Sequence, residues 1–231
     1  MKTIGLIGGM SWQSSKSYYE FTNQRVNELA GGSHSAKSIM LSVNFKEIEA
    51  LTFQGKWDEI GLMMADAAKQ LEKAGADIVL LCTNTIHLVS NAIETAVQIP
   101  FLHIADATGK VIQAKKLKKV ALLGTRFTME KDFYTKIIEE NYGIEVIIPI
   151  KEDRKAIHDI IYNELVKGQF TDTSREKCVE IIKRLEAVGA KGIIMGCTEL
   201  PLLVPETNVS LPTFDTAKIH ADQAVEWALN V

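Results

Sequence analysis

The sequence predicts an α/β protein made of two pseudo-symmetric Rossmann-like lobes. Short apolar segments alternate along the chain with longer segments that carry apolar residues at helical spacing. Strands that alternate with helices form right-handed βαβ units, so we expect each lobe to hold a mostly parallel four-stranded sheet flanked by helices. The order of segments in the second half repeats that of the first, which favours two lobes.

The first lobe is expected to contain residues 1–104 together with residues 216–231. Its predicted strands cover residues 3–7, 39–43, 77–81 and 99–104. Its predicted helices cover residues 14–29 and 56–73, with a further helix after Asn84. Glycine follows the first two of these helices and commonly ends a helix, because it adopts the left-handed conformation without steric cost.

The second lobe is expected to contain residues 105–215. Its predicted strands cover residues 119–123, 144–150, 192–195 and 211–214. Its predicted helices cover residues 129–140, 154–167 and 174–188. A last predicted helix at 216–229 returns to the first lobe and closes the chain.

Equivalent positions in the two halves lie at a nearly constant distance along the sequence. Gly8 and Gly124 are 116 residues apart (124 − 8), and Thr83 and Cys197 are 114 apart (197 − 83). A duplicated lobe would bring equivalent strand ends together, so we expect the active site in the cleft between the lobes. The alternative is that unrelated βα units look alike at this level of detail.

Composition excludes several classes of function. The 26 basic and 29 acidic residues give a net charge of −3, with no general attraction to nucleic acid or to an anionic membrane. No apolar run approaches the roughly 18 residues of a spanning helix, and residues 1–9 lack a full signal peptide. We therefore expect a cytoplasmic protein. The three cysteines include no CxxC pair and indicate neither a disulfide framework nor a metal site.

The segment Gly196-Cys197-Thr198-Glu199 directly follows an apolar strand. Ligands of open α/β sheets bind at the carboxyl ends of strands. A helix start after Cys197 would lower the pKa of the thiol, which suits a group that gives and takes a proton. The alternative is a buried structural cysteine.

Polar residues also follow the predicted strand 77–81. Cys82-Thr83-Asn84-Thr85 provides hydroxyl and amide groups, and Asn84 and Thr85 are suited to bind a carboxylate. An ordinary helix N-cap is the alternative and is compatible with that role. His87 falls in the first turn of the next helix, where a structural role is favoured over a catalytic one.

The loop Gly8-Gly9-Met10-Ser11 follows the first strand but lacks the GxGxxG spacing of a dinucleotide-binding loop. A nicotinamide cofactor is therefore not expected. The equivalent loop of the second half is Gly124-Thr125-Arg126.

Together these motifs resemble the aspartate/glutamate racemase superfamily over nearly the whole chain. Three longer segments, residues 4–12, 102–108 and 122–126, are most similar to its broad-specificity amino-acid racemase branch. The motifs are Gly8-Gly9-Met10, Thr83-Asn84-Thr85, Leu123-Gly124-Thr125 and, most specific, Gly196-Cys197-Thr198-Glu199.

The resemblance implies a racemase without metal or pyridoxal phosphate, acting on a small amino-acid substrate and forming a homodimer. One residue would remove the Cα proton on one face and another would return a proton on the opposite face. The positions that match these two bases are Thr83 and Cys197. The matching substrate-binding residues are Met10, Asn84, Thr85, Thr125, Thr198 and Glu199.

The chain departs from the family at the first base, where Thr83 stands in place of a cysteine. Cys82 is adjacent, but neighbouring side chains of an extended segment point to opposite faces, so Thr83 is favoured. The weaker acidity of a hydroxyl predicts slow or direction-biased racemisation. Val166 occupies the position where dicarboxylate-specific relatives carry a basic residue, so aspartate, glutamate and other substrates all remain open.

Two alternatives follow from this departure. One is a decarboxylase or isomerase of a small carboxylic acid that protonates its substrate only through Cys197. The other is an amino-acid-binding protein without catalysis.

Overall fold

The computed structural model describes residues 1–230 and divides the chain into two compact units. Unit 1 contains residues 1–104 and the residues from 220 onward, and unit 2 contains residues 105–219. The second boundary lies inside the last helix, α11 (Thr216–Leu229). The sequence-based boundary at residue 216 coincides with the start of that helix.

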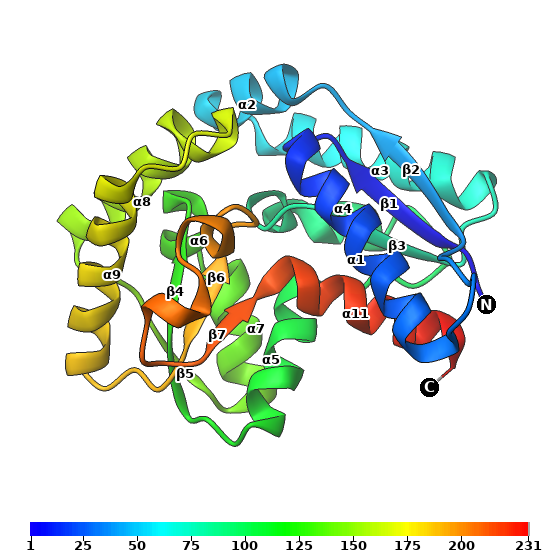
Figure 1. Ribbon diagram of the computed structural model, residues 1–231. Coiled ribbons are helices and arrows are strands. Elements are labelled where there is room, and N and C mark those ends of the chain that lie inside the picture. The colour runs from blue at the N-terminus through cyan, green and yellow to red at the C-terminus, as the bar shows by residue number, and fades with distance from the viewer. Residues whose placement is uncertain (231) are drawn as a thin grey trace. The chain divides into compact units, whose positions relative to one another are not determined.

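Unit 1 contains a parallel sheet with the strand order β2-β1-β3 (Figure 1). Its strands are β1 (Ile4–Gly8), β2 (Ser38–Ser42) and β3 (Ile78–Leu81). Its helices before residue 104 are α1 (Trp12–Ala30), α2 (Phe45–Gln54), α3 (Trp57–Lys73), the 3₁₀ helix η1 (Thr85–Val89) and α4 (Ser90–Glu94).

The core of unit 1 forms between this sheet and helix α3. Every residue of β1 and β3 is buried, as expected for parallel strands covered on both faces. Helix α3 contributes Ile60, Met64, Ala68 and Leu71, whose spacing of three to four residues places them on one face. The carboxyl ends of β1 and β3 are thereby held side by side.

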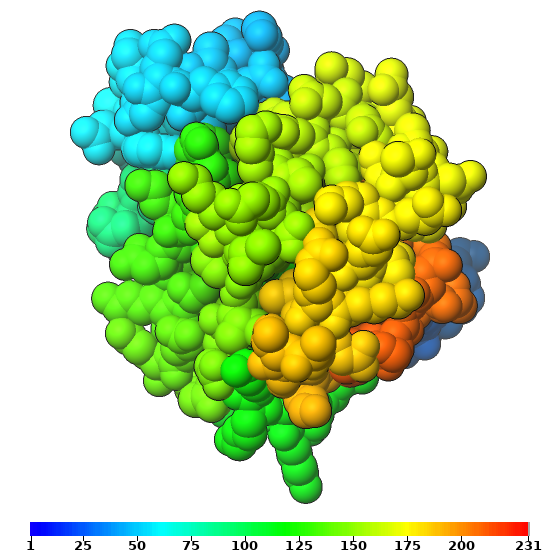
Figure 2. Space-filling view, turned by 90° about the vertical axis from the view of Figure 1, so that its left-hand side faces the viewer, coloured from blue at the N-terminus to red at the C-terminus, as the bar shows by residue number. Residues whose placement is uncertain are grey.

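Unit 2 contains a parallel sheet with the order β5-β4-β6-β7. Its strands are β4 (Lys119–Gly124), β5 (Glu145–Ile147), β6 (Ile193–Gly196) and β7 (Thr213–Asp215). Its helices are α5 (Ile104–Ala114), α6 (Arg126–Glu130), α7 (Asp132–Tyr142), α8 (Lys151–Asn163), η2 (Leu165–Lys167), α9 (Asp172–Ala187), α10 (Leu200–Leu203) and η3 (Glu206–Asn208). Figure 2 shows α8, in yellow-green, and α9, in yellow to gold, side by side on one face of unit 2.

The two sheets pair their strands in the same register. Gly5 pairs with Val79 in unit 1, and Ala121 pairs with Ile193 in unit 2. The offsets between these partners are 116 (121 − 5) and 114 (193 − 79), the same values that the sequence motifs show. Thr83 and Cys197 are also 114 residues apart. Thr83 lies four residues after Val79, and Cys197 lies four residues after Ile193, so they occupy equivalent places beyond β3 and β6.

The fold class is confirmed, but the expected fourth strand of the first sheet is wrong. Residues 99–104 form only one isolated bridge, between Val79 and Phe101. Only the Pro100 carbonyl and the Leu102 amide bond to Val79 of β3, and helix α5 already begins at Ile104. The bridge still matches the pairing of Ile193 with Thr213 in unit 2.

Two helical regions also differ from expectation. The segment after Asn84 is a 3₁₀ helix followed by one short α-helix, not a single helix. Helix α2 is absent from the sequence-based prediction, although Asn44 and Glu47 have the spacing of a capping box. In the structure Asn44 caps this helix by accepting from the Lys46 amide and donates to Glu47.

None of the helices that the structure describes combines the length and the apolar character that a membrane crossing needs. Within residues 1–230 there is also no group of three or more His, Cys, Asp or Glu placed to hold a metal ion.

The tight turn after β1 depends on glycine at position 9. Gly9 has φ +95°, and a Cβ there would lie 2.1 Å from the carbonyl oxygen of Val43. We predict that Gly9→Ala lowers the free energy of unfolding by about 2–4 kcal/mol in urea titrations. Gly32, with φ +57° and no atom within 4 Å of its Cβ position, is the matched control, and Gly32→Ala should cost at most about 1 kcal/mol. Equal losses would contradict the steric account.

Candidate active site

The β1–α1 loop of unit 1 is tied to the carboxyl end of β3. Ser14 Oγ donates to the carbonyl oxygen of Cys82 at 2.7 Å, and the Gly9 amide donates to Ser15 Oγ at 2.7 Å. Ser11 caps α1 by accepting from the Ser14 amide. Met10 lies in this loop and is buried. The loop is therefore held in place by hydroxyl groups that the sequence prediction did not use.

The polar residues after β3 are buried within the chain. Thr83, Asn84 and Thr85 keep 8%, 4% and 7% of their surface exposed. Asn84 precedes η1, but its side chain does not make an N-cap bond, so the N-cap interpretation of Asn84 is wrong.

Cys82 and Thr83 differ in their environment although they are adjacent. Cys82 is fully buried, and burial alone raises the pKa of its thiol far above the ordinary value. The backbone ladder ends there, because the Cys82 amide makes the last bond to β1, to the carbonyl of Ile7 at 2.9 Å. Thr83 is the first residue beyond this ladder.

In unit 2 the residue after β4 caps the next helix. Thr125 Oγ1 accepts from the Thr128 amide at 3.2 Å, and the two threonine hydroxyls lie 3.1 Å apart. The glycine before it permits close packing, because a Cβ at Gly124 would lie 2.8 Å from the Gly196 carbonyl oxygen. The ends of β4 and β6 are thus in direct contact.

Cys197, Thr198 and Glu199 form a hydrogen-bonded cluster beyond β6. Cys197 Sγ donates to Glu199 Oε2 at 3.1 Å, and Thr198 Oγ1 donates to the same oxygen at 2.7 Å. Both Cys197 and Glu199 are buried. Because the carboxylate accepts from the sulfur, the resting form of Cys197 is the protonated thiol.

The expected lowering of the Cys197 pKa is wrong. Burial and then the negative charge of Glu199 raise the pKa well above the ordinary value of 9.0, and the amides of Glu199 and Leu200 lower it less. The helix that follows, α10, has only four residues, so its dipole is small. The thiol is therefore suited to deliver a proton and needs an acceptor before it can remove one.

The structure brings the predicted residues together in two groups. Met10, Thr83, Asn84 and Thr85 lie at the strand ends of unit 1. The group in unit 2 consists of Thr125, Cys197, Thr198 and Glu199.

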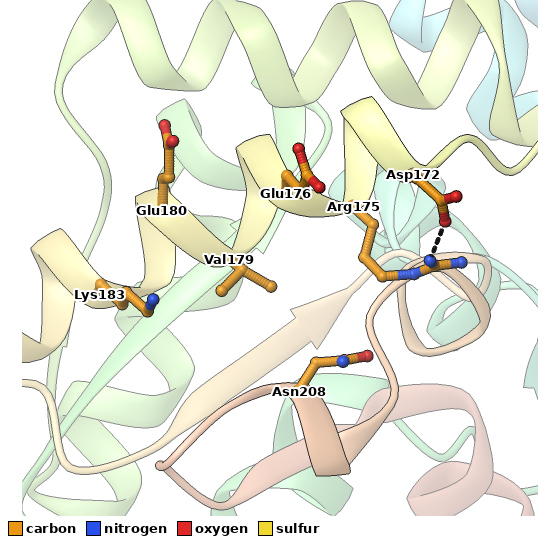
Figure 3. Close-up of a pocket in the computed structure, with 7 residues that line it drawn as sticks. All are labelled: Asp172, Arg175, Glu176, Val179, Glu180, Lys183 and Asn208. Carbon is orange, nitrogen blue, oxygen red and sulfur yellow. Dashed lines mark hydrogen bonds and ion pairs between the residues drawn. The ribbon is translucent and has the colours of Figure 1, made fainter.

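A surface hollow of about 500 Å³ in unit 2 lies elsewhere, along α9 and η3. Figure 3 shows its lining, in which Arg175 and Asp172 form an ion pair. None of the predicted site residues lines it.

Two parallel sheets with polar residues directly beyond their strand ends are typical of α/β proteins that bind small molecules at that edge. The family model of the Asp/Glu/Hydantoin racemases matches residues 7–224, and the chain belongs to this family. Membership assigns it to the amino-acid racemases, which are isomerases.

Individual relatives agree with this assignment. The broad specificity amino-acid racemase RacX of Bacillus subtilis is 30% identical over 176 residues, which cover 74% of each chain. A crystal structure of a candidate Asp/Glu racemase from Yersinia pestis has 49% identity and a TM-score of 0.93, covering 99% of this chain and 100% of that one. An aspartate racemase homologue from Pyrococcus horikoshii has 36% identity and a TM-score of 0.84 with the same coverage.

The raised pKa of Cys197 predicts how its alkylation depends on pH. The thiolate is the reactive form, so iodoacetamide should modify Cys197 slowly near neutral pH and faster above pH 9. Glu199→Gln removes the charge that raises the pKa and should increase the rate at a given pH by roughly tenfold, about one pKa unit. Mass spectrometry can follow each cysteine, with the fully buried Cys82 and Cys178 as internal controls. Rapid modification at neutral pH, or no response to Glu199→Gln, would contradict this electrostatic account.

Proposed function

We propose that the chain interconverts the enantiomers of a small amino acid by direct proton transfer at Cα, without a cofactor, with Thr83 and Cys197 as the two proton-transfer groups. The observation that supports this assignment most is the shared register of the two sheets, which gives Thr83 and Cys197 equivalent places beyond β3 and β6. Each group would serve one face of the same Cα atom.

The cluster around Cys197 suggests how the thiol is used. In one direction Cys197 donates its proton to the carbanion at Cα. In the other direction the thiol first loses its proton to water, and the thiolate then removes the Cα proton. Glu199 Oε2, 3.1 Å from the sulfur, would orient the thiol. The Glu199 charge also suits the substrate ammonium, which would offset the repulsion that raises the thiol pKa.

The remaining predicted residues would bind the amino-acid backbone. Asn84, Thr85, Thr125 and Thr198, which are buried or half-buried, would bind the carboxylate, and Met10 would pack beside Cα. The Thr198 hydroxyl would first have to leave Glu199 Oε2. Stabilising a carbanion requires donors that are already in place, because an amino-acid Cα–H is a very weak acid. The hydrogen bonds that fix the loops at both strand ends support such preorganisation.

Thr83 makes the two directions chemically unequal, because a hydroxyl loses its proton far less readily than a thiol. The two enantiomers have equal free energy in water, so kcat/KM must be equal in the two directions. A bias would therefore be seen in kcat and in KM separately. Aspartate, glutamate and broader specificity all remain proposals, as do a homodimer and a cytoplasmic location.

A second candidate is a decarboxylase or isomerase that uses Cys197 only as an acid. The protonated resting state of Cys197 favours it, since such chemistry needs one donor and no base on the opposite face. Release of carbon dioxide from a malonate-type acid, without racemisation of any amino acid, would identify it.

The proposal predicts that deuterium from heavy water enters Cα of at least one free amino acid. NMR of a panel of L- and D-amino acids would show loss of the α-proton signal, and chiral chromatography would show the opposite enantiomer. Cys197→Ser should reduce racemisation by about a thousandfold or more, because the thiol is lost from one face. Cys178→Ser, in a fully buried thiol on α9, is the control and should leave the rate unchanged. The proposal fails if no amino acid exchanges.

A further inference from the structure

Three histidines of unit 1 form a buried cluster next to Thr83. His87, His103 and His220 are all nearly inaccessible, and the ring centres of His87 and His103 lie 4.6 Å apart. The ring of His220 lies 5.7 Å from that of His87. The proposed proton transfer does not use this cluster, and within the described residues it does not form a metal site.

His87 is held at both ring nitrogens by the backbone. Its Nδ1 lies 2.7 Å from the carbonyl oxygen of Thr83, and the amide of Ile104 donates to its Nε2 at 3.2 Å. A carbonyl can only accept and an amide N–H can only donate, so the proton must be on Nδ1 and Nε2 must be bare. The ring is therefore neutral and in a single tautomer.

The backbone of Thr83 needs such an anchor because it lies between two regular elements. The ladder of β3 ends with the amide of Cys82, and η1 begins only at Thr85. The Thr83 amide turns back to the carbonyl of Leu81 at 2.8 Å, within the same strand end. The His87 ring then holds the Thr83 carbonyl from the far side.

The cluster also links this strand end to the segment in which the chain leaves unit 1. The chain leaves unit 1 after Ile104. The amide of Ile104 donates to Nε2 of His87. His220 bonds through Nε2 to the Leu102 carbonyl at 2.8 Å and through Nδ1 to Tyr18 at 2.8 Å. The peptide groups of residues 102 and 104 are thus fixed by two histidines.

We propose that His87 is a positioning residue that aims the Thr83 hydroxyl by donating from Nδ1 to the Thr83 carbonyl, with Ile104 fixing the ring. This inference rests on the proposed function, because it concerns the group that would act on one face of Cα. His87 itself does not touch the substrate. Its loss should impair proton transfer on the Thr83 face and leave the Cys197 face intact.

A matched pair of substitutions separates the two bonds of the ring. In His87→Asn the side-chain amide nitrogen takes the place of Nδ1 and can still donate to Thr83. In His87→Gln the longer side chain places its oxygen near Nε2, so it can accept from Ile104 but leaves the Thr83 carbonyl without its side-chain donor. The exposed His34, replaced by Gln, is the control for the substitution itself.

We expect His87→Gln to lower the kcat of racemisation at least tenfold with KM changed less than threefold, and His87→Asn to retain most of the wild-type kcat. The enantiomer whose Cα–H faces Cys197 should still exchange deuterium in His87→Gln, while the other enantiomer loses exchange. A general folding defect would reduce both exchanges in proportion. Equal effects of Asn and Gln, or a proportional loss of both exchanges, would overturn the inference.

A measurement on the wild-type protein covers the case in which His87→Gln does not fold. Two-dimensional ¹⁵N NMR of the imidazoles should show the less common Nδ1–H tautomer for His87, and an Nε2–H form would overturn the inference. Absence of exchange in the wild-type protein would remove the proposed function. Wild-type exchange with an unaffected His87→Gln variant would remove only the role of His87.

Discussion

The register of the parallel ladders is the constraint on which the rest of the structure depends. β3 pairs with β1 in unit 1, and β6 pairs with β4 in unit 2. The pairs in one sheet correspond to the pairs in the other by offsets of 116 and 114 residues. A shift by one residue would turn every side chain of a strand to the opposite face. Both faces of β3 and β6 are buried, so such a shift would require the closely packed side chains on both faces to repack. The register therefore determines where the residues directly beyond the strand ends lie.

The two equivalent positions carry different groups, a hydroxyl at Thr83 and a thiol at Cys197. Their surroundings differ as well. Cys197 carries a carboxylate 3.1 Å from its sulfur, which raises the pKa of the thiol and so favours its protonated form. The carbonyl of Thr83 instead accepts from the neutral ring of His87. The proposed function therefore needs a proton that can leave Cys197 and a well-placed but poorly acidic hydroxyl at Thr83.

Much of the fold follows from periodicity in the sequence, because buried strands and amphipathic helices have distinct patterns. The apolar runs of β3 and β6 and the helix α11 are predicted close to their observed bounds. The expected strand at 99–104 is wrong because an apolar run does not reveal that helix α5 begins at Ile104 and leaves only one bridge to β3. Helix α2 carries a capping signal at Asn44 that a search for apolar periodicity alone does not use.

The candidate site is predictable in its residue types but not in its electrostatics. A glycine, a thiol and two polar residues after a strand indicate a site, and the structure brings Cys197, Thr198 and Glu199 together. The direction of the thiol pKa depends on burial and on the side-chain conformation of Glu199, which no sequence pattern specifies. The role of His87 depends likewise on a contact with Ile104, seventeen residues further along the chain.

The most direct measurement of the central claim is enantiomer-resolved deuterium exchange in Thr83→Val, which removes the hydroxyl and keeps the branched shape. If Thr83 and Cys197 act on opposite faces of one Cα, this variant should exchange only the enantiomer that faces Cys197, with retention of configuration, and should not racemise it. Continued racemisation, or equal exchange of both enantiomers, would contradict the account.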